Sequence, residues 1–331
     1  MSGSELDALV QTLRESRGFQ HKNDIAGVVA SLASRMPRGA DDLAQAVGVG
    51  DDCAAIPDGD GYLLFAIEGM VADFVSAMPW FAGYSSVMVN VSDIYAMGGR
   101  PIAVVDALWS DGIAAADQVL AGMAAASVAY RVPVVGGHSN TRSTSSQLAV
   151  AIVGRANALL SSFAAKPGDR LLMAVDVRGR FEDPHPFWNA SVGAPAERLR
   201  DDLEMLPLLA ESGLCDAAKD ISMAGTLGTA LMLLECSNVG ARIDLDAIPR
   251  PDGVDFQRWL SAFPSFGFLL SVREKHVDEV IARFAARSLS CAEIGTVDAS
   301  REVVVRQRNE AALLWDFRDA PFIGAPVGRA T

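Results

Sequence analysis

The chain contains 331 residues, half of them hydrophobic, and it carries a net charge of −13 with a sequence pI near 4.7. This length is enough for two domains, each with its own hydrophobic core. A chain this acidic repels nucleic-acid phosphates and anionic membranes, and we therefore expect neither as a partner. An anionic nucleotide would need a metal cation to screen nearby carboxylates.

The N-terminal segment and the cysteines indicate a cytoplasmic protein. Glu5, Asp7 and Glu15 interrupt the first residues, which therefore do not read as a signal peptide, and no apolar run reaches the roughly 18–20 residues of a membrane span. The four cysteines are Cys53, Cys215, Cys236 and Cys291. They are far apart and form no CxxC pair, so neither structural zinc nor a disulfide framework is predicted.

Apolar periodicity and turn residues predict mixed helices and strands in the first half. Helices are expected over 5–16 and 24–35, a strand over 62–67, a helix from Pro79 to Gly98, a strand over 102–108, a helix over 114–130, and strands over 132–135 and 148–153. The helix that begins at Pro79 has one buried face, because its apolar residues recur at spacings of three and four.

A domain junction is predicted where small residues accumulate before the tight turn Lys166-Pro167-Gly168-Asp169. The second half then repeats the mixed pattern, with strands over 170–175, 241–245, 266–272 and 292–297 and helices over 196–209, 226–236 and 274–287. We therefore expect an α+β protein with two domains, residues 1–157 and 158–331.

The first chemical signal is the adjacent acid pair Asp51-Asp52 after Gly50. Two carboxylates in a turn offer oxygen ligands that suit a hard divalent cation. Such a pair is also ordinary solvated turn chemistry, and the sequence leaves both interpretations open.

A second signal lies in the helix that begins at Pro79. Asn90, Asp93 and Met97 fall at i, i+3 and i+7, so they share one helix face. Asp93 sits in an otherwise apolar stretch, and burying a carboxylate is costly unless a cation or a hydrogen-bond donor meets it. The alternative is an aspartate on a solvated face.

Two further motifs could contact an anion. In Val135-Gly136-Gly137-His138-Ser139 an apolar strand runs into two glycines, which let backbone N–H groups approach closely. His138 alone is equally compatible with a structural hydrogen bond. Asp220-Ile221-Ser222 opens a helix whose N-terminus could bind an anion, or whose residues Ser222 and Thr226 could simply cap it.

The order of the motifs GDDCA, NVSDIYAMGGRP, GGHSN, KPGD and DISMAG is more specific than any single one. Over roughly residues 47–297 it resembles the superfamily of aminoimidazole ribonucleotide synthetase, thiamine-monophosphate kinase, selenophosphate synthetase and a hydrogenase maturation protein. The stretch that ends in Pro101 is similar to the selenophosphate synthetase SDIYAMGG segment, and Asp220-Ile221-Ser222 is similar to the DIS of the kinase and the ribonucleotide synthetase.

The resemblance implies a homodimer whose N-terminal domains build a shared barrel, with the C-terminal domain alongside, and ATP with Mg²⁺ as cofactors. It implies that carboxylates hold the metal, at Asp51, Asp52, Glu68, Asp93 and Asp220. It places the nucleotide phosphates beside Asn90, Gly136, Gly137, His138 and Ser139, and it makes Asp220 and His138 the candidate catalytic residues.

Some positions depart from the family patterns. Lys22 matches the lysine of the selenophosphate synthetase loop, but the catalytic cysteine of that enzyme has no counterpart, because no cysteine precedes Cys53. Met223 replaces the second acid of the kinase motif DISDG. Glu68 replaces an aspartate of the family. The stretch 181–191 matches no member and is expected to be a loop that either contacts substrate or packs its tryptophan.

These observations predict ATP- and Mg²⁺-dependent phosphoryl transfer to an oxygen of a small metabolite, of kinase or synthetase type. The alternative is a nucleotide-binding accessory or maturation protein without turnover of its own.

Overall fold

The computed structural model describes residues 4–35 and 48–325 of the chain, which forms two compact units. The seven-stranded unit comprises Met1–Asp51, Leu159–Val192 and Leu209–Thr331, and the five-stranded unit comprises Asp52–Ala158 and Gly193–Leu208. The chain therefore crosses between the units near the expected junction at 157, but also at three other places. The N-terminal helices pack with the C-terminal half.

The five-stranded unit contains one mixed sheet in the order β1-β2-β5-β3-β4. Its strands are β1 (Ala54–Asp58), β2 (Gly61–Met70), β3 (Arg100–Asp111), β4 (Val134–Asn140) and β5 (Arg142–Ala156), and its helices are α3 (Ala72–Ala77), α4 (Pro79–Ala96), α5 (Ile113–Tyr130) and α6 (Ala196–Leu203). β3 and β4 are parallel because α5 connects them, and the other pairs are antiparallel.

Glycines let α4 and α5 approach each other closely. A Cβ atom on Gly83 would lie 2.0 Å from the carbonyl oxygen of Val119, and one on Gly122 would lie 1.9 Å from that of Trp80. Neither position has room for a larger residue. By length and composition α5 could cross a membrane, which is weak evidence for a span, and here it packs along α4 and β3.

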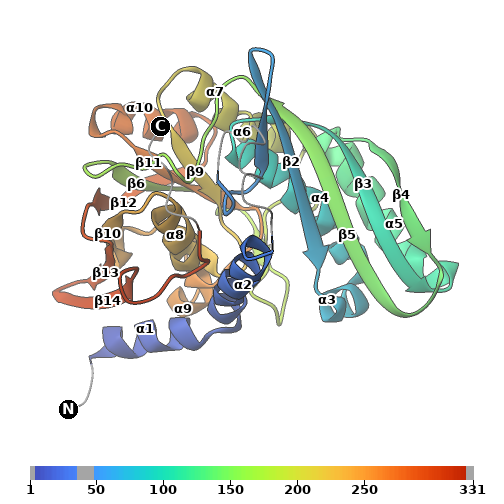
Figure 1. Ribbon diagram of the computed structural model, residues 1–331, viewed down its shortest axis with the longest axis horizontal. Helices are drawn as coiled ribbons and strands as arrows, with labels where there is room; N and C mark the ends of the chain where they lie inside the picture. Colours follow the sequence, from blue (N-terminus) through green and yellow to red (C-terminus); the bar gives the residue numbers. More distant parts are fainter. Residues whose placement is uncertain (1–3, 36–47, 326–331) are drawn as a thin grey trace. The chain divides into compact units, whose positions relative to one another are not determined.

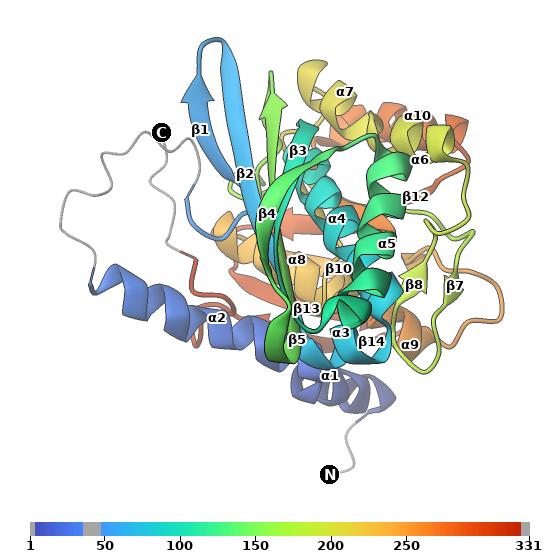
Figure 2. The same ribbon diagram turned by 90° about the vertical axis from the view of Figure 1, so that its right-hand side faces the viewer.

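The two faces of the five-stranded sheet differ. Helices α4 and α5 cover one face (Figure 2). Val104, Val150 and Ile152 share a face by strand register and are buried. Ile67 and Val105 point to the opposite face, where they flank Ala151 in register and are 64% and 42% exposed. Helices α4 and α5 thus lie on one side of the sheet (Figure 1), and the residues named on the other side are apolar and exposed.

The seven-stranded unit is built around a sheet in the order β14-β13-β10-β12-β6-β11-β9. Its strands are β6 (Arg170–Val175), β9 (Ala217–Asp220), β10 (Gly240–Asp244), β11 (Gly267–Val272), β12 (Ser290–Asp298), β13 (Glu302–Gln307) and β14 (Glu310–Asp316), with a separate hairpin of β7 (Arg180–Phe181) and β8 (Trp188–Asn189). Its helices are α1 (Glu5–Glu15), α2 (Arg17–Ala33), α8 (Gly225–Cys236), α9 (Phe256–Leu260), α10 (Val277–Ala286) and the short 3₁₀ turns η2 (Leu245–Ala247) and η3 (Glu274–His276), while α7 (Met205–Glu211) spans the crossing at residue 208.

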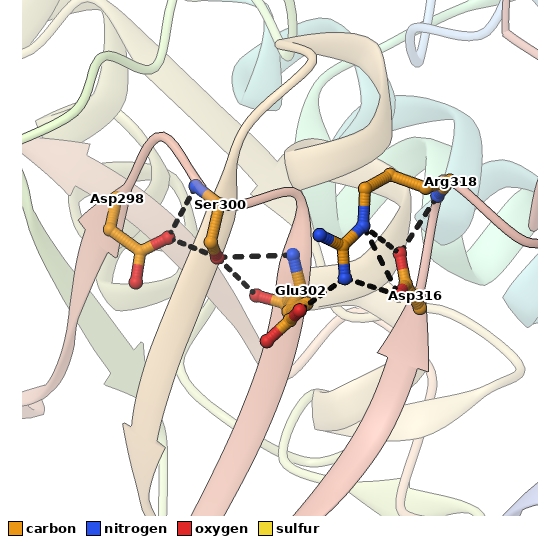
Figure 3. Close-up of polar contacts among 5 residues, drawn as sticks. All are labelled: Asp298, Ser300, Glu302, Asp316 and Arg318. Atoms are coloured by element: carbon orange, nitrogen blue, oxygen red, sulfur yellow. Dashed lines mark hydrogen bonds and ion pairs between the residues drawn. The ribbon is translucent and has the colours of Figure 1, made fainter.

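Burial of the seven-stranded sheet is nearly complete at its centre. Every residue of β11 is buried, and α8 packs on β9, β10 and β11. The last expected strand, 292–297, is followed by β13 and β14, which the sequence prediction missed because Glu302, Arg306 and Glu310 interrupt their apolar pattern. Figure 3 shows how this edge is joined: Arg318 bonds Asp316 and Glu302, while Ser300 closes the turn from Asp298.

Candidate functional site

Asp52 and Asp93 meet within the five-stranded unit. Asp52 precedes β1 and Asp93 lies on α4, and their carboxylate oxygens are within 4.8 Å of one another. Asp93 is only 6% exposed. Two carboxylates this close repel each other in a partly buried site, and a hard cation with oxygen ligands would relieve that repulsion.

Asn90 adds a polar atom on the same side of α4, one turn before Asp93. Its side chain is fully buried, and its Nδ2 donates a 2.7 Å hydrogen bond to the carbonyl oxygen of Ser86. Its Oδ1 accepts no hydrogen bond from any residue that the structure describes. Leaving a buried amide oxygen without a donor is costly, so this atom is available to a ligand.

The other two candidate aspartates of the metal set belong to the seven-stranded unit. Asp51 Oδ2 accepts hydrogen bonds from Ser161 Oγ at 2.7 Å and from the Ser162 amide at 3.0 Å, so one of its oxygens holds the loop that follows β5. Asp220 ends β9 and is buried, as is its neighbour Lys219.

The polar turn after Asp220 does not cap α8 through a side chain. The N-cap residue of α8 is Ala224, and no side-chain cap hydrogen bond is present there. The Ser222 amide instead donates to Thr229 Oγ1 at 3.2 Å. The capping interpretation of this motif is therefore wrong. Lys219, to which the sequence analysis assigned no role, is a buried lysine next to this candidate ligand in the sequence.

Glu68 lies on strand β2 of the five-stranded unit. Strand register places Glu68, Val150, Asp106 and Gly137 in one row across β2, β5, β3 and β4. On β2, Glu68 is three residues from Phe65, which pairs with Ala54 of β1, the strand that Asp52 precedes.

Asp106 in this row was missed by the sequence analysis. Burial raises the pKa of its carboxyl group above the ordinary value. A Cβ atom on Gly137 would lie 2.3 Å from Asp106 Oδ1, so the glycine makes room for this carboxyl group. The only signal in the sequence was an acid inside the apolar run 102–108.

The Gly136-Gly137-His138-Ser139 motif continues a strand and does not follow one. All four residues lie within the edge strand β4, and all are exposed. The prediction of a strand that ends at Val135 was wrong because parallel pairing with β3 continues to Asn140. The His138 ring lies 5.9 Å from that of Trp109.

Two other segments also differ from expectation. Lys22 lies on helix α2 and not in a loop, and Gly18 is required there because a Cβ atom would lie 2.4 Å from the carbonyl oxygen of Met223. In the stretch 181–191, Trp188 is buried, and its Nε1 donates to the carbonyl oxygen of Asp176 at 2.9 Å. The packing alternative therefore holds for this tryptophan.

Comparison with known proteins agrees with this architecture. The family model described as AIR synthase related protein, N-terminal domain, matches residues 50–156, and that of the C-terminal domain matches residues 178–308. An uncharacterised Synechocystis protein is 50% identical over 323 residues, which cover 96% of this chain and 98% of that protein.

Two solved structures share the fold. T. maritima PurL complexed with ATP has a TM-score of 0.73 at 20% identity, covering 99% of this chain and 54% of that one, so this chain spans about half of PurL. A ThiL complexed with AMPPCP and TMP has a TM-score of 0.64 at 19% identity, covering 86% of this chain and 93% of that one. With both family domains matched in order, the chain belongs to the AIR synthase related family and has its two-domain α+β fold.

Proposed function

We propose that this protein binds ATP together with Mg²⁺ and transfers a phosphoryl group to an oxygen of a small metabolite, as a kinase or a synthetase. The observation that carries the proposal is the meeting of Asp52 and Asp93 beside the buried Oδ1 of Asn90. Nucleotides bound to the structural relatives PurL and ThiL support it.

The donor set suits Mg²⁺, because carboxylate and amide oxygens are its usual protein ligands. When bound, the cation would neutralise charge on the nucleotide phosphates. Asp52 and Asp93 would hold it, and Asn90 would offer its Oδ1 to the cation or to a nucleotide donor. We extend the metal set, on the order of the sequence motifs, to Asp51 and Asp220.

The proposal also includes Glu68 and the residues of the β4 motif. Glu68 and Asp106 lie in one row with Gly137, and Gly136, His138 and Ser139 follow on the exposed edge strand. We propose that this row lies toward the phosphates or the acceptor substrate. Glu68 would then join the metal set, as the order of the sequence motifs implies, or contact substrate.

We also propose that the protein is a homodimer through the exposed face of the five-stranded sheet. Phe65, Ile67 and Val105 are each more than 40% exposed on that face. Sheets with exposed apolar surface are normally covered, and a second copy covers it symmetrically.

Calorimetric titration of ATP with Mg²⁺ tests the metal site. Asp93→Asn keeps the shape of the side chain and removes its charge, so nucleotide affinity should fall tenfold or more, which is about 1.4 kcal/mol. Asp117→Asn is the matched control, because Asp117 is an exposed acid on the neighbouring helix α5. Wild-type affinity in a folded Asp93→Asn variant would overturn the assignment.

ADP release against candidate metabolites separates turnover from the accessory alternative. Mg²⁺-dependent stabilisation by ATP, without ADP release on any small metabolite, would favour a nucleotide-binding accessory protein.

A further inference from the structure

The C-terminal end of α8 carries a buried carboxylate that binds a distant part of the chain. Glu235 Oε1 accepts hydrogen bonds from the amides of Phe322 (3.0 Å) and Gly324 (3.2 Å), and Oε2 accepts one from Ile323 (2.7 Å). Three consecutive amides therefore converge on one side chain. Only a carboxylate can accept all of them, since an amide would turn a donor toward one N–H group.

Residues 322–325, here called the strap, are packed on both sides. The Phe322 ring is fully buried, with ring centroids 5.4 Å from Phe19 on α2 and 5.2 Å from Trp315. The backbone of Gly324 lies against Ala26 on the same helix. The strap thus lies between α2 and α8.

The strap also packs against the turn that carries Asp51. A Cβ atom on Gly50 would lie 3.2 Å from Ala325 Cβ and 3.5 Å from Ile323 Cδ1. Gly50 has φ +125°, which a residue with a side chain rarely adopts. Position 50 therefore requires a glycine for the turn to pack against the strap.

The last residue of α8, Cys236, contacts the same turn, and the C-cap residue Ser237 binds the segment that Asp51 contacts. Cys236 Sγ donates to the carbonyl oxygen of Gly50 at 3.6 Å. Ser237 Oγ donates to the carbonyl oxygen of Ser162 and accepts from the Ala165 amide at 2.9 Å. The Ser162 amide in turn donates to Asp51 Oδ2.

Burial makes this arrangement costly. Burial raises the pKa of Glu235 above its ordinary value, and the three amides and the nearby Arg301 oppose that rise. A carboxylate is costly to bury, and we attribute the presence of Glu235 here to its hydrogen bonds with the strap amides.

We propose that Glu235 is a positioning residue for the candidate metal site: by binding the strap it fixes the Gly50–Asp51 turn, and with it the carboxylates of Asp51 and Asp52. This rests on the proposed function for the identity of the ligand. The contacts among Glu235, the strap and the turn do not depend on it.

Glu235→Gln tests the proposal, with Glu279→Gln as the matched control on the exposed side of α10. Two measurements are made without nucleotide: amide hydrogen exchange at 322–324 and at Ser162, and Mn²⁺ affinity by electron paramagnetic resonance. In Glu235→Gln, exchange should increase at both places, and Mn²⁺ affinity should fall by about tenfold, the lower end for residues that orient metal ligands. The control should match wild type.

Faster exchange at 322–324 with unchanged Ser162 exchange and unchanged Mn²⁺ affinity would overturn the proposal, because the strap would then be a local structural element. If Glu235→Gln does not fold, native-state exchange of the wild-type protein decides. Amides 322–324 and Ser162 should open with one common free energy, and clearly different values would overturn the coupling. Absence of Mn²⁺ binding to the wild type would instead count against the proposed function.

Discussion

The two sheets of this protein differ in how completely their strands are buried. In the seven-stranded sheet every residue of β11 is buried, and the strands on either side, β6 and β9, are almost as completely covered. In the five-stranded sheet every residue of β4 is exposed, and Phe65 and Ile67 of β2 point into solvent.

The difference in burial indicates that the seven-stranded sheet is a closed core, whereas the five-stranded sheet keeps one face open. The seven-stranded sheet completes its core within its own unit, around residues such as Leu171, Met173 and Leu269. The five-stranded sheet completes only the face under α4 and α5. Its other face is apolar like a core but is exposed, which is the reason for proposing that a second copy of the chain covers it.

The largest expected effect is on association. Ile67→Lys would place a charge at the centre of the exposed face, where truncation or charge at a buried contact commonly costs 2–4 kcal/mol, so the dimer should weaken by about a hundredfold or more. Sedimentation across a range of concentrations measures this. Val128→Lys is the control, because Val128 is 75% exposed on α5 and outside the sheet.

A wild-type protein that stays monomeric at micromolar concentration would remove the basis for this comparison. So would an Ile67→Lys variant that associates as strongly as the control.

The next effect is on stability, and it compares glycines of the two sheets. A Cβ atom on Gly267 in β11 would lie 2.4 Å from the carbonyl oxygen of Ala174, one on Gly137 in β4 would lie 2.3 Å from Asp106 Oδ1, and one on Gly136 would lie 3.9 Å from Val105. Strand β11 has neighbours on both sides and cannot shift, whereas β4 is an edge.

Urea unfolding should therefore rank the three alanine variants. Gly267→Ala should cost about 3 kcal/mol, Gly137→Ala about 1–2 kcal/mol, and Gly136→Ala close to nothing. Equal losses for Gly136→Ala and Gly137→Ala would show that Asp106 does not restrict this position.

Sequence reasoning found the two-domain α+β fold and most central elements, because β6, β11 and α8 are mostly apolar. It missed β13 and β14, which begin and end with polar residues, and it misplaced the end of β4. Pairing with β3, a long-range contact, extends that strand through two glycines that read locally as a turn. Asp52 and Asp93 were predicted as one site from motifs, but Asp106 and Glu235 were not, because their neighbours come from distant parts of the chain.

A smaller effect is expected at His138 on the open edge strand. If its side chain meets nucleotide phosphate as a cation, His138→Gln should lose ATP affinity mainly at pH 6, by about three- to fivefold, with a smaller loss at pH 8. Titration calorimetry at both pH values measures this. Equal losses would favour a structural hydrogen bond, and no loss at either pH would mean that His138 does not contact the nucleotide.

The smallest effect concerns the outer edge of the seven-stranded sheet, where Asp316 ends β14 (Figure 3). Side-chain and backbone hydrogen bonds from Arg318 lower the pKa of Asp316 from 3.8 to about 2. Because the folded-state pKa lies below the unfolded one, this contact stabilises the protein above about pH 4, and the stabilisation is lost as the pH falls toward 2. Carbon-13 NMR titration of the Asp316 carboxyl group should give a value near 2 that returns toward 3.8 in Arg318→Gln. Arg306→Gln, which removes the same charge from an exposed position on β13, should leave the titration unchanged. A value near 3.8 in the wild-type protein would show that solvent screens this edge completely and that Arg318 does not hold it.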